Sequence, residues 1–353
     1  MDYQPTTSTS SLTSAHTELT EQDGRSTSWS DSGTPSLPSI DNDSDAMSIA
    51  ESVKSSTMSL RSSIYDFVEE NGRTYHKYKE GRYFLPNDVA EQERLDLQHQ
   101  LFTFSIGGRL HICPLPENPG RVLDIATGTG LWAIEFAIKN PESEVVGTDL
   151  SPIQPQYLPQ NCHFEIDDAE DEWTFSAPFD FIHGRALMSC FNDPRYVFRQ
   201  AYAHLAPGGH IELQDALFPM RWIGEPPRDS ALYRWNELML QGVARLGRSW
   251  SHVQYYAEYL RDAGFEDVVD RRYYWPTSPW AKGRRYKALS LYFQEDMCAG
   301  LEAMSLRVLG VLGMAPQEVR DFVEEVRRDF RDTNKHAYVT VSYIYARKPA
   351  TAA

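Results

Sequence analysis

Between residues 116 and 215 the chain alternates short apolar runs with stretches of helical period. Five runs have the length of a buried strand: Arg121–Ile125, Glu144–Asp149, His163–Asp167, Phe179–His183 and His210–Gln214. Apolar positions over Leu131–Lys139, and again after Asn192-Asp193-Pro194, follow the helical period instead. This alternation predicts a parallel sheet with helices on both faces, and ligands bind such sheets beyond the carboxyl ends of the strands.

The pattern continues on both sides of this region. Tyr65 to Leu110 is aromatic and reads as helical, with a helix over Glu91–Phe104 that ends at Gly107-Gly108. After Asp215 the regularity loosens. Four further helices and two further strands are predicted there: helices over Asp229–Arg245, Ser251–Ala263, Lys282–Leu312 and Pro316–Asp332, and strands over Asp267–Tyr274 and Tyr338–Tyr345. The predicted fold class is α/β, with a seven-stranded, mostly parallel sheet flanked by helices and an N-terminal helical cap.

These patterns divide the chain into three parts. Residues 1–60 are rich in Ser and Thr with few large apolar side chains, so we expect a disordered tail. Such a tail is either a phosphorylatable docking segment or a passive extension. Residues 61–115 are the predicted cap. Residues 116–349 are the predicted Rossmann-like domain, with helical insertions at about 216–250 and 276–335.

Composition excludes several classes of function. The net charge of −16 argues against a nucleic-acid partner, because phosphate binding needs clustered positive charge. No window is long and apolar enough for a membrane span, and no secretory signal is visible. The four cysteines are scattered, which argues against a zinc site or disulfide framework and indicates a reducing compartment. We therefore expect a cytoplasmic or nuclear protein without a metal.

The stretch Val122–Trp132 carries the most informative chemistry. A strand runs into a loop that contains Gly128 and Gly130, and a helix follows. Glycines permit tight turns and close approach of a ligand to the backbone, and the helix N-terminus offers free amides. With Ala133 and Asp149 the loop also fits the fingerprint of a dinucleotide site, so nicotinamide binding is an alternative.

Three features favour methyl transfer over nicotinamide chemistry. Asp124 precedes the loop, where a carboxylate suits an ammonium group and repels a pyrophosphate. The acidic run Asp167–Glu170 follows the third strand and can accept a hydrogen bond from an adenine amine. Pro207-Gly208-Gly209 precedes the fifth strand, and a late alternating strand closes the fold. In addition, residues 116–215 contain no Tyr-x-x-x-Lys pair of the kind that a dehydrogenase would use.

Several spaced motifs between Tyr75 and Asp215 resemble the fungal LaeA-like branch of class I S-adenosylmethionine-dependent methyltransferases. The matching motifs are Tyr83–Asp88, Glu91–Leu97, the glycine loop, Gly147–Pro155, Ile166–Glu170 with Trp173, His183–Arg185 and Leu205–Glu212. The last third of the chain resembles the family only in its predicted elements. The resemblance implies the class I methyltransferase fold and S-adenosylmethionine as the cofactor.

The resemblance also implies residue roles. Asp124, Gly128 and Gly130 would hold the methionine part of the cofactor, Asp149 the ribose hydroxyls, and Asp168 with Ala169 the adenine. The full set of expected cofactor-binding residues is Tyr83, Asp124, Ala126, Gly128, Gly130, Asp149, Leu150, Asp168, Ala169 and Arg185. Ala126 departs from the family motif, which usually has Gly there. No catalytic residue is assigned, and the candidates for a general base are His99, His183 and Glu212.

Two functions remain open for such a methyltransferase. The first is transfer to a small molecule, in particular a secondary metabolite, bound in a pocket formed by the segments after Asp215 and after Tyr274. These segments contain six aromatic residues that suit an apolar acceptor: Phe218, Trp222, Trp235, Trp250, Trp275 and Trp280. The second is regulation of secondary metabolism through protein partners or protein methylation, with the Ser-rich tail as a docking segment.

Overall fold

Seven strands form the predicted sheet in a computed structural model that describes residues 66–350. Their order is β5-β4-β3-β6-β7-β9-β8. The strands are β3 (Arg121–Ile125), β4 (Glu144–Asp149), β5 (Cys162–Ile166), β6 (Phe179–Arg185), β7 (Leu205–Trp222), β8 (Glu266–Pro276) and β9 (Ala337–Arg347). The first five pair in parallel, and β9 lies antiparallel between β7 and β8. The predicted fold class is confirmed, whereas the predicted tail lies outside the described residues.

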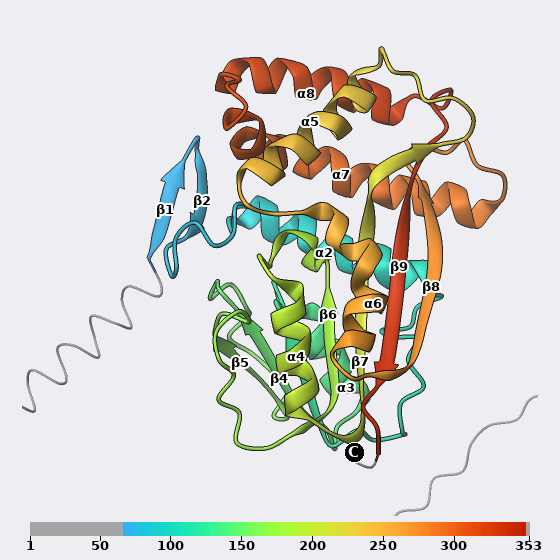
Figure 1. Cartoon of the computed structure of the whole chain (residues 1–353). Coiled ribbons are helices and arrows are strands. Elements are labelled where there is room, and N and C mark those ends of the chain that lie inside the picture. The colour runs from blue at the N-terminus through green and yellow to red at the C-terminus, as the bar shows by residue number, and fades with distance from the viewer. Residues whose placement is uncertain (1–65, 351–353) are drawn as a thin grey trace, which may run out of the picture. The chain divides into compact units, whose positions relative to one another are not determined.

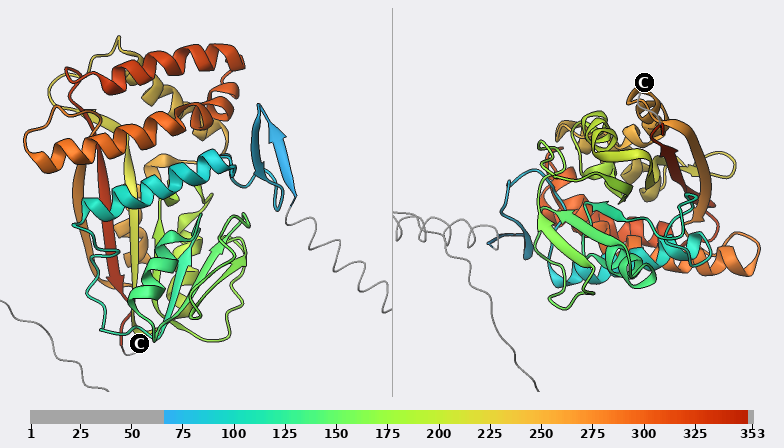
Figure 2. Two further views of the ribbon diagram at one scale, coloured as in Figure 1. Left: turned by 180° about the vertical axis from the view of Figure 1, so that it is seen from behind. Right: turned by 90° about the horizontal axis from the view of Figure 1, so that it is seen from below.

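Helices cover both faces of the sheet because alternate residues of its central strands point to opposite sides. Val122 and Phe181 pack with α3 (Leu131–Lys139) on one face. Leu123 and Ile182 pack on the other face with α4 (Pro194–His204) and α6 (Tyr256–Asp262). Figure 1 shows α4 and α6 in front of the sheet, and the left view of Figure 2, seen from the opposite side, shows α3 on the other face.

A further helical layer lies beyond the carboxyl ends of the parallel strands (Figures 1 and 2). It consists of α2 (Val89–Ser105), α5 (Ala231–Arg245), α7 (Arg284–Gly310) and α8 (Pro316–Arg331), joined by one large apolar cluster. Strand β7 extends into this layer and continues to pair with β9 at Ala216, Leu217, Arg221 and Trp222, with an irregularity between Leu217 and Arg221. The prediction that the fifth strand ends at Gln214 is therefore wrong, since the strand runs on to Trp222.

The N-terminal cap begins with a β-hairpin and not with a helix. Strands β1 (Phe67–Glu70) and β2 (Arg73–His76) pair antiparallel around Asn71-Gly72. Both turn residues have positive φ, 52° and 75°, as a two-residue hairpin turn requires. The helical prediction from Tyr65 is thus wrong for residues 67–76. It holds for α2, which begins where the Asp88 side chain accepts a hydrogen bond from the Glu91 amide.

One buried ion-pair network joins α2 and α7 within the helical layer. Arg94 on α2 donates to both carboxylate oxygens of Glu91, at 3.1 and 2.7 Å, and to Asp296 on α7 at 2.6 Å. All three side chains are buried, so each needs the others to offset its desolvation. The network fixes α2 against α7 above the carboxyl edge of the sheet.

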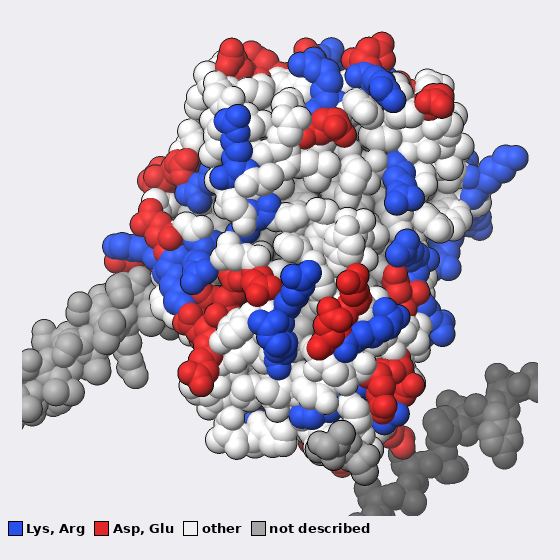
Figure 3. Space-filling view, viewed as in Figure 1, with Lys and Arg blue, Asp and Glu red and all other residues white. Residues whose placement is uncertain are grey.

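The surface shown in Figure 3 carries no extended field of one sign, since acidic and basic side chains are interspersed around an uncharged central area. Within residues 66–350, no helix is both long enough and apolar enough to cross a bilayer.

Candidate functional site

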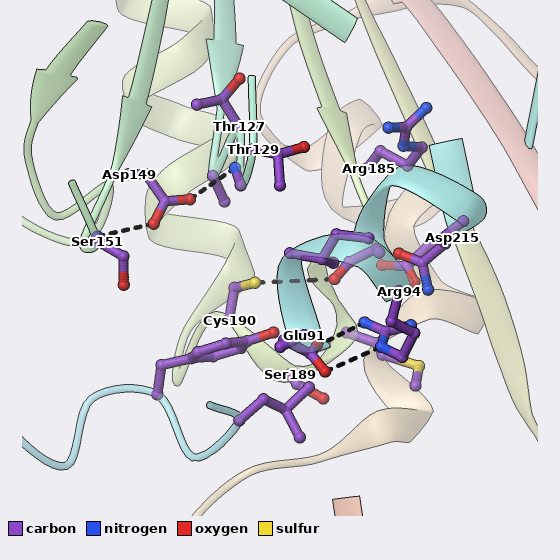
Figure 4. A pocket seen from close by; sticks show the side chains of 18 of the residues that line it. Glu91, Arg94, Thr127, Thr129, Asp149, Ser151, Arg185, Ser189, Cys190 and Asp215 are labelled. Atoms are coloured by element: carbon purple, nitrogen blue, oxygen red, sulfur yellow. Dashed lines mark hydrogen bonds and ion pairs between the residues drawn. The ribbon is translucent and has the colours of Figure 1, made fainter. Parts of the chain in front are cut away.

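A cavity of about 190 Å³, measured for the centre of a water-sized sphere, lies between the carboxyl edge of the sheet and the helical layer. Figure 4 shows it from close by. Nine of the ten predicted cofactor-binding residues line it, and the exception is Gly130. Of the three candidate bases only His183 lines it, because His99 and Glu212 lie outside the lining.

The two loop positions 128 and 130 require glycine for different physical reasons. Gly128 lines the cavity with a φ of 61°, a conformation that favours glycine. Gly130 also has positive φ, but a Cβ there would lie 2.3 Å from the Phe164 ring, and one at Gly147 would lie 2.5 Å from it. Packing against β5 is therefore sufficient to require glycine at position 130, whether or not its backbone also contacts a ligand.

Ala126 occupies a backbone position that favours glycine. Its φ is 52°, in the left-handed region that costs an L-residue with a Cβ about 1–2 kcal/mol. This conformation gives a physical reason why the family motif usually has Gly there. Alanine, with the smallest side chain that carries a Cβ, keeps the loop shape at a modest cost in stability.

Asp149, at the end of β4, holds the glycine loop in place by hydrogen bonding. One carboxylate oxygen accepts from the Gly128 amide at 2.8 Å and the other from the Ser151 amide at 2.9 Å. Burial raises the pKa of Asp149 to about 6. Each oxygen retains a lone pair that can accept a further hydrogen bond from a group in the cavity.

Asp124 is already bonded to two side chains. His183 Nδ1 donates to Asp124 Oδ1 at 2.7 Å, and Thr127 Oγ1 donates to Oδ2. The His183 ring stacks on Trp132 with centroids 3.7 Å apart and planes within 3°. Burial lowers the pKa of His183, so the neutral ring carries its proton on Nδ1, and Nε2 has no partner among the described residues.

Arg185 at the end of β6 has an unpaired donor. Its Nη2 lies 3.1 Å from His99 Nδ1, and His99 Nε2 lies 3.1 Å from Glu135 Oε1. Burial and the neighbouring Arg185 lower the pKa of His99 to about 4, so His99 is neutral and accepts from Arg185. Both His99 nitrogens are therefore used, which makes it a positioning residue for Arg185. Arg185 Nη1 is buried without a hydrogen-bond partner among residues 66–350.

The segment between β2 and α2 covers the end of the cavity near β5. Asp168 accepts from Lys79 Nζ at 3.0 Å and lies 3.5 Å from Arg82 Nε. Tyr83 of the same segment lines the cavity, as do Leu150 and Ala169 on the sheet side. The cap thus closes over this end through ion pairs, and Ala169 remains at the cavity wall.

Glu212 forms hydrogen bonds within the fold and does not line the cavity. Its carboxylate accepts from the backbone amides of Ile112 and Cys113, at 2.9 and 2.6 Å, and from Gln214 at 2.8 Å. It is fully buried within the sheet. Its bonds hold the segment before β3 against β7, which removes it from the candidates for a base.

Replacing Glu212 by Gln is expected to flatten the dependence of stability on pH. Burial raises the pKa of Glu212 from 4.5 to about 7, so the folded chain binds more protons than the unfolded chain between these values. The free energy of unfolding therefore falls as pH rises through this window, and removing the group reduces the slope by at most about 1.4 kcal/mol per pH unit. Urea unfolding at several pH values measures it. Identical slopes for both proteins would contradict the assignment.

Asp215 was not among the predicted site residues. It directly follows the predicted strand His210–Gln214, lines the cavity and is 2% exposed. The signal that could have found it is its position, a carboxylate at the carboxyl end of a strand like Asp124 and Asp149. Of the six aromatic residues expected around an acceptor, Phe218, Trp250 and Trp275 line the cavity and the other three do not.

Comparisons with known proteins add independent information. Residues 97–269 match the family model of a methyltransferase domain. The chain is 36% identical over 313 residues to methyltransferase pytC of Aspergillus terreus, a match that covers 88% of this chain and 96% of that protein. It is 31% identical to the secondary metabolism regulator laeA of Aspergillus fumigatus, over 93% of this chain and 85% of that protein.

A third relative and one solved structure are also similar to this chain. The chain is 34% identical to the protein-methionine methyltransferase laeA of Emericella nidulans, over 80% of this chain and 77% of that protein. A solved structure of Haemonchus contortus phosphoethanolamine N-methyltransferase 2 with S-adenosyl-L-methionine is 16% identical, with a TM-score of 0.43, and covers 86% of this chain and 75% of that chain.

Proposed function

The chain belongs to the LaeA-like family of fungal class I methyltransferases, and from this premise we propose that its cavity binds S-adenosylmethionine and that the acceptor is a small molecule of secondary metabolism. The proposal goes beyond the family in naming the residues that hold the cofactor and the kind of acceptor. Its main support is the arrangement of Arg185.

The unpaired Arg185 donor supports an anionic group in the cavity. A buried guanidinium nitrogen without an acceptor costs free energy unless a ligand supplies one. Burial accordingly lowers the pKa of Arg185. The carboxylate of an amino-acid moiety fits this nitrogen, and Asp124 provides a negative charge nearby for the ammonium group. These residues therefore fit the methionine part of the cofactor.

The opposite side of the cavity fits a nucleoside. Asp149 keeps free lone pairs for two ribose hydroxyls, while Gly128 and Ser151 hold its carboxylate in place. At the end near β5, Ala169 offers its backbone and Asp168 a carboxylate to an adenine ring. In Figure 4 Asp149 and Ser151 lie on one side of the cavity, and Arg185 lies on the other.

The cofactor supplies a methyl group activated on a sulfonium. The chain's own residues orient the acceptor and exclude water, and positioning of this kind contributes up to about 7–11 kcal/mol to catalysis in ideal cases. An aromatic face suits the cationic sulfonium, and Tyr83 lines the cavity whereas Trp222 lies outside its lining. Of the predicted bases we retain His183, whose Nε2 is unpaired.

A small-molecule acceptor is favoured over a protein by the walls of the cavity. Phe218, Trp250 and Trp275 line the cavity and are nearly fully buried, which suits a compact apolar molecule. Methylation of a protein, as the name of the Emericella relative describes for that protein, is the alternative. We propose a cytoplasmic or nuclear location, supported by four free cysteines.

Isothermal titration with S-adenosylhomocysteine and with NADH tests the cofactor assignment. We expect the first to bind with a stoichiometry of one and the second to show no saturable binding, because a pyrophosphate would meet the Asp124 charge. Heat-unfolded protein serves as the control for unspecific heats. Tighter binding of NADH, or no binding of S-adenosylhomocysteine, would overturn the proposed function.

A further inference from the structure

Five aromatic side chains line one part of the cavity, which we call its inner end: Phe102, Phe218, Trp250, Trp275 and Phe293. Their rings are set at steep angles to one another. Phe102 and Trp275 meet edge to face with centroids 4.8 Å apart, and Phe218 and Trp250 are tilted by 56° at the same distance. Phe293 extends this wall, 5.5 Å from Trp275. Apart from Phe102, whose ring centroid lies 5.2 Å from the Arg185 guanidinium carbon, these side chains come from the chain after Asp215.

Most polar side chains at this end already satisfy one another. Arg94 donates to both oxygens of Glu91 and to Asp296, all within 3.1 Å. Ser189 accepts from the Trp250 indole nitrogen at 2.9 Å. These groups support the walls and leave little free hydrogen-bonding capacity for a ligand.

Asp215 is the exception. Its Oδ1 accepts from the Ala216 amide at 2.9 Å, but the hydrogen bond to its Oδ2 from Tyr256 Oη is long, at 3.4 Å. A carboxylate has about four acceptor sites, so Oδ2 retains capacity. The side chain lines the cavity, and in Figure 4 it lies on the same side as Arg94 and Arg185, opposite Asp149. Burial raises the pKa of Asp215 to about 7, and hydrogen bonding from the Ala216, Leu187 and Met188 amides and the Tyr256 hydroxyl offsets only part of this rise.

We propose that Asp215 binds a hydrogen-bond donor of the methyl acceptor, which defines the acceptor class as an apolar, ring-bearing small molecule with an O–H or N–H group. This inference rests on the proposed function, because it takes the cavity as the place where cofactor and acceptor meet. Asp215 is then the residue that selects among apolar molecules of similar shape.

The physical basis for this selection is the cost of a desolvated carboxylate. An apolar ring that fills the inner cavity removes any water from Asp215, and only a donor on the ring restores the lost hydrogen bond. A ring of the same shape without a donor leaves the carboxylate unpaired. An acidic acceptor is disfavoured as well, because its negative charge would lie next to that of Asp215.

Two probes with the same ring system test the inference: 2-naphthol, which has an O–H donor, and 2-methoxynaphthalene, which has none. Each is titrated calorimetrically into protein saturated with S-adenosylhomocysteine, at one pH above the pKa of Asp215. Hydrogen bonds to charged groups contribute about 1.5–3 kcal/mol, so we expect 2-naphthol to bind at least about tenfold more tightly. In Asp215→Asn this preference should drop by about threefold or more, because bonds to neutral acceptors are roughly half as strong.

Glu212→Gln is the matched control. Glu212 lies on the same strand, is equally buried and has a similarly raised pKa, but it lies outside the cavity lining. Its preference for 2-naphthol should equal that of the wild type. Equal affinities of the two probes for the wild type, no binding of either probe, or an unchanged preference in Asp215→Asn would each overturn the inference. S-adenosylhomocysteine binding is measured for every protein, so that failure of the cofactor site is recognised separately.

Discussion

Replacing Asp149 by alanine is expected to weaken S-adenosylhomocysteine binding by at least about 100-fold. The carboxylate would lose charge-assisted hydrogen bonds to two ribose hydroxyls, each of about 1.5–3 kcal/mol, and tenfold in affinity corresponds to about 1.4 kcal/mol. The Gly128 amide would also lose its acceptor, so the loop that approaches the ligand would be less well fixed. Isothermal titration measures the change directly.

A second ligand and a second variant make this result specific. 5′-Methylthioadenosine contains the ribose but no amino-acid part, and its affinity should fall to a similar degree in Asp149→Ala. Asp171→Ala is the control, because Asp171 is a half-exposed acid that pairs with Lys79 near the same end of the cavity. Such a pair contributes about 0–1 kcal/mol, so the control should change affinity by less than about fivefold. Equal effects of the two variants would contradict the ribose assignment.

Arg185→Met is expected to weaken S-adenosylhomocysteine binding by about 100-fold and to leave 5′-methylthioadenosine binding unchanged. Truncating one partner of a buried, hydrogen-bonded charge pair costs about 2–5 kcal/mol, and methionine fills much of the volume of the arginine stem. The selectivity arises because only the first ligand carries the carboxylate proposed to pair with Arg185 Nη1. The same calorimetric titrations therefore separate the two halves of the cofactor site.

Arg185→Lys provides the conservative comparison. A lysine keeps the charge but lacks the planar fork, so it should recover part of the affinity for S-adenosylhomocysteine. If Arg185→Met weakened both ligands equally, Arg185 would support the cavity in general and would not recognise the amino-acid part. If neither ligand were affected, the unpaired nitrogen would have no role in cofactor binding.

Much of the sheet could be predicted from local pattern. Runs such as Arg121–Ile125 and Glu144–Asp149 are continuous apolar segments of strand length, and the structure has both within the predicted bounds. The extension of β7 to Trp222 depends on pairing with Ala337–Thr340, more than a hundred residues away, which no local window contains. The β1–β2 hairpin does have a local signal, Asn71-Gly72, which is typical of a two-residue hairpin turn. The helical prediction there rests on the surrounding aromatic residues, which are compatible with strands as well.

The site could be predicted only in part, because sequence does not reveal how a side chain is engaged. Glu212 and Asp215 are carboxylates near the end of the same predicted strand, yet one holds backbone amides within the fold and the other lines the cavity. Both ring nitrogens of His99 form hydrogen bonds, one with Arg185 and one with Glu135, which lie 86 and 36 positions away in the sequence. Gly130 fits a ligand-binding motif, but the close approach of the Phe164 ring is by itself a reason for glycine at this position.

The two ends of the cavity come from different lengths of the chain. The residues proposed for the cofactor's polar groups lie within 124–185, whereas most of the aromatic wall lies after Asp215, on β7, β8, α7 and the turn at Trp250. Substitutions after Asp215 replace none of the residues proposed for the polar groups of the cofactor. The preference for an acceptor can therefore change while those residues keep their identity.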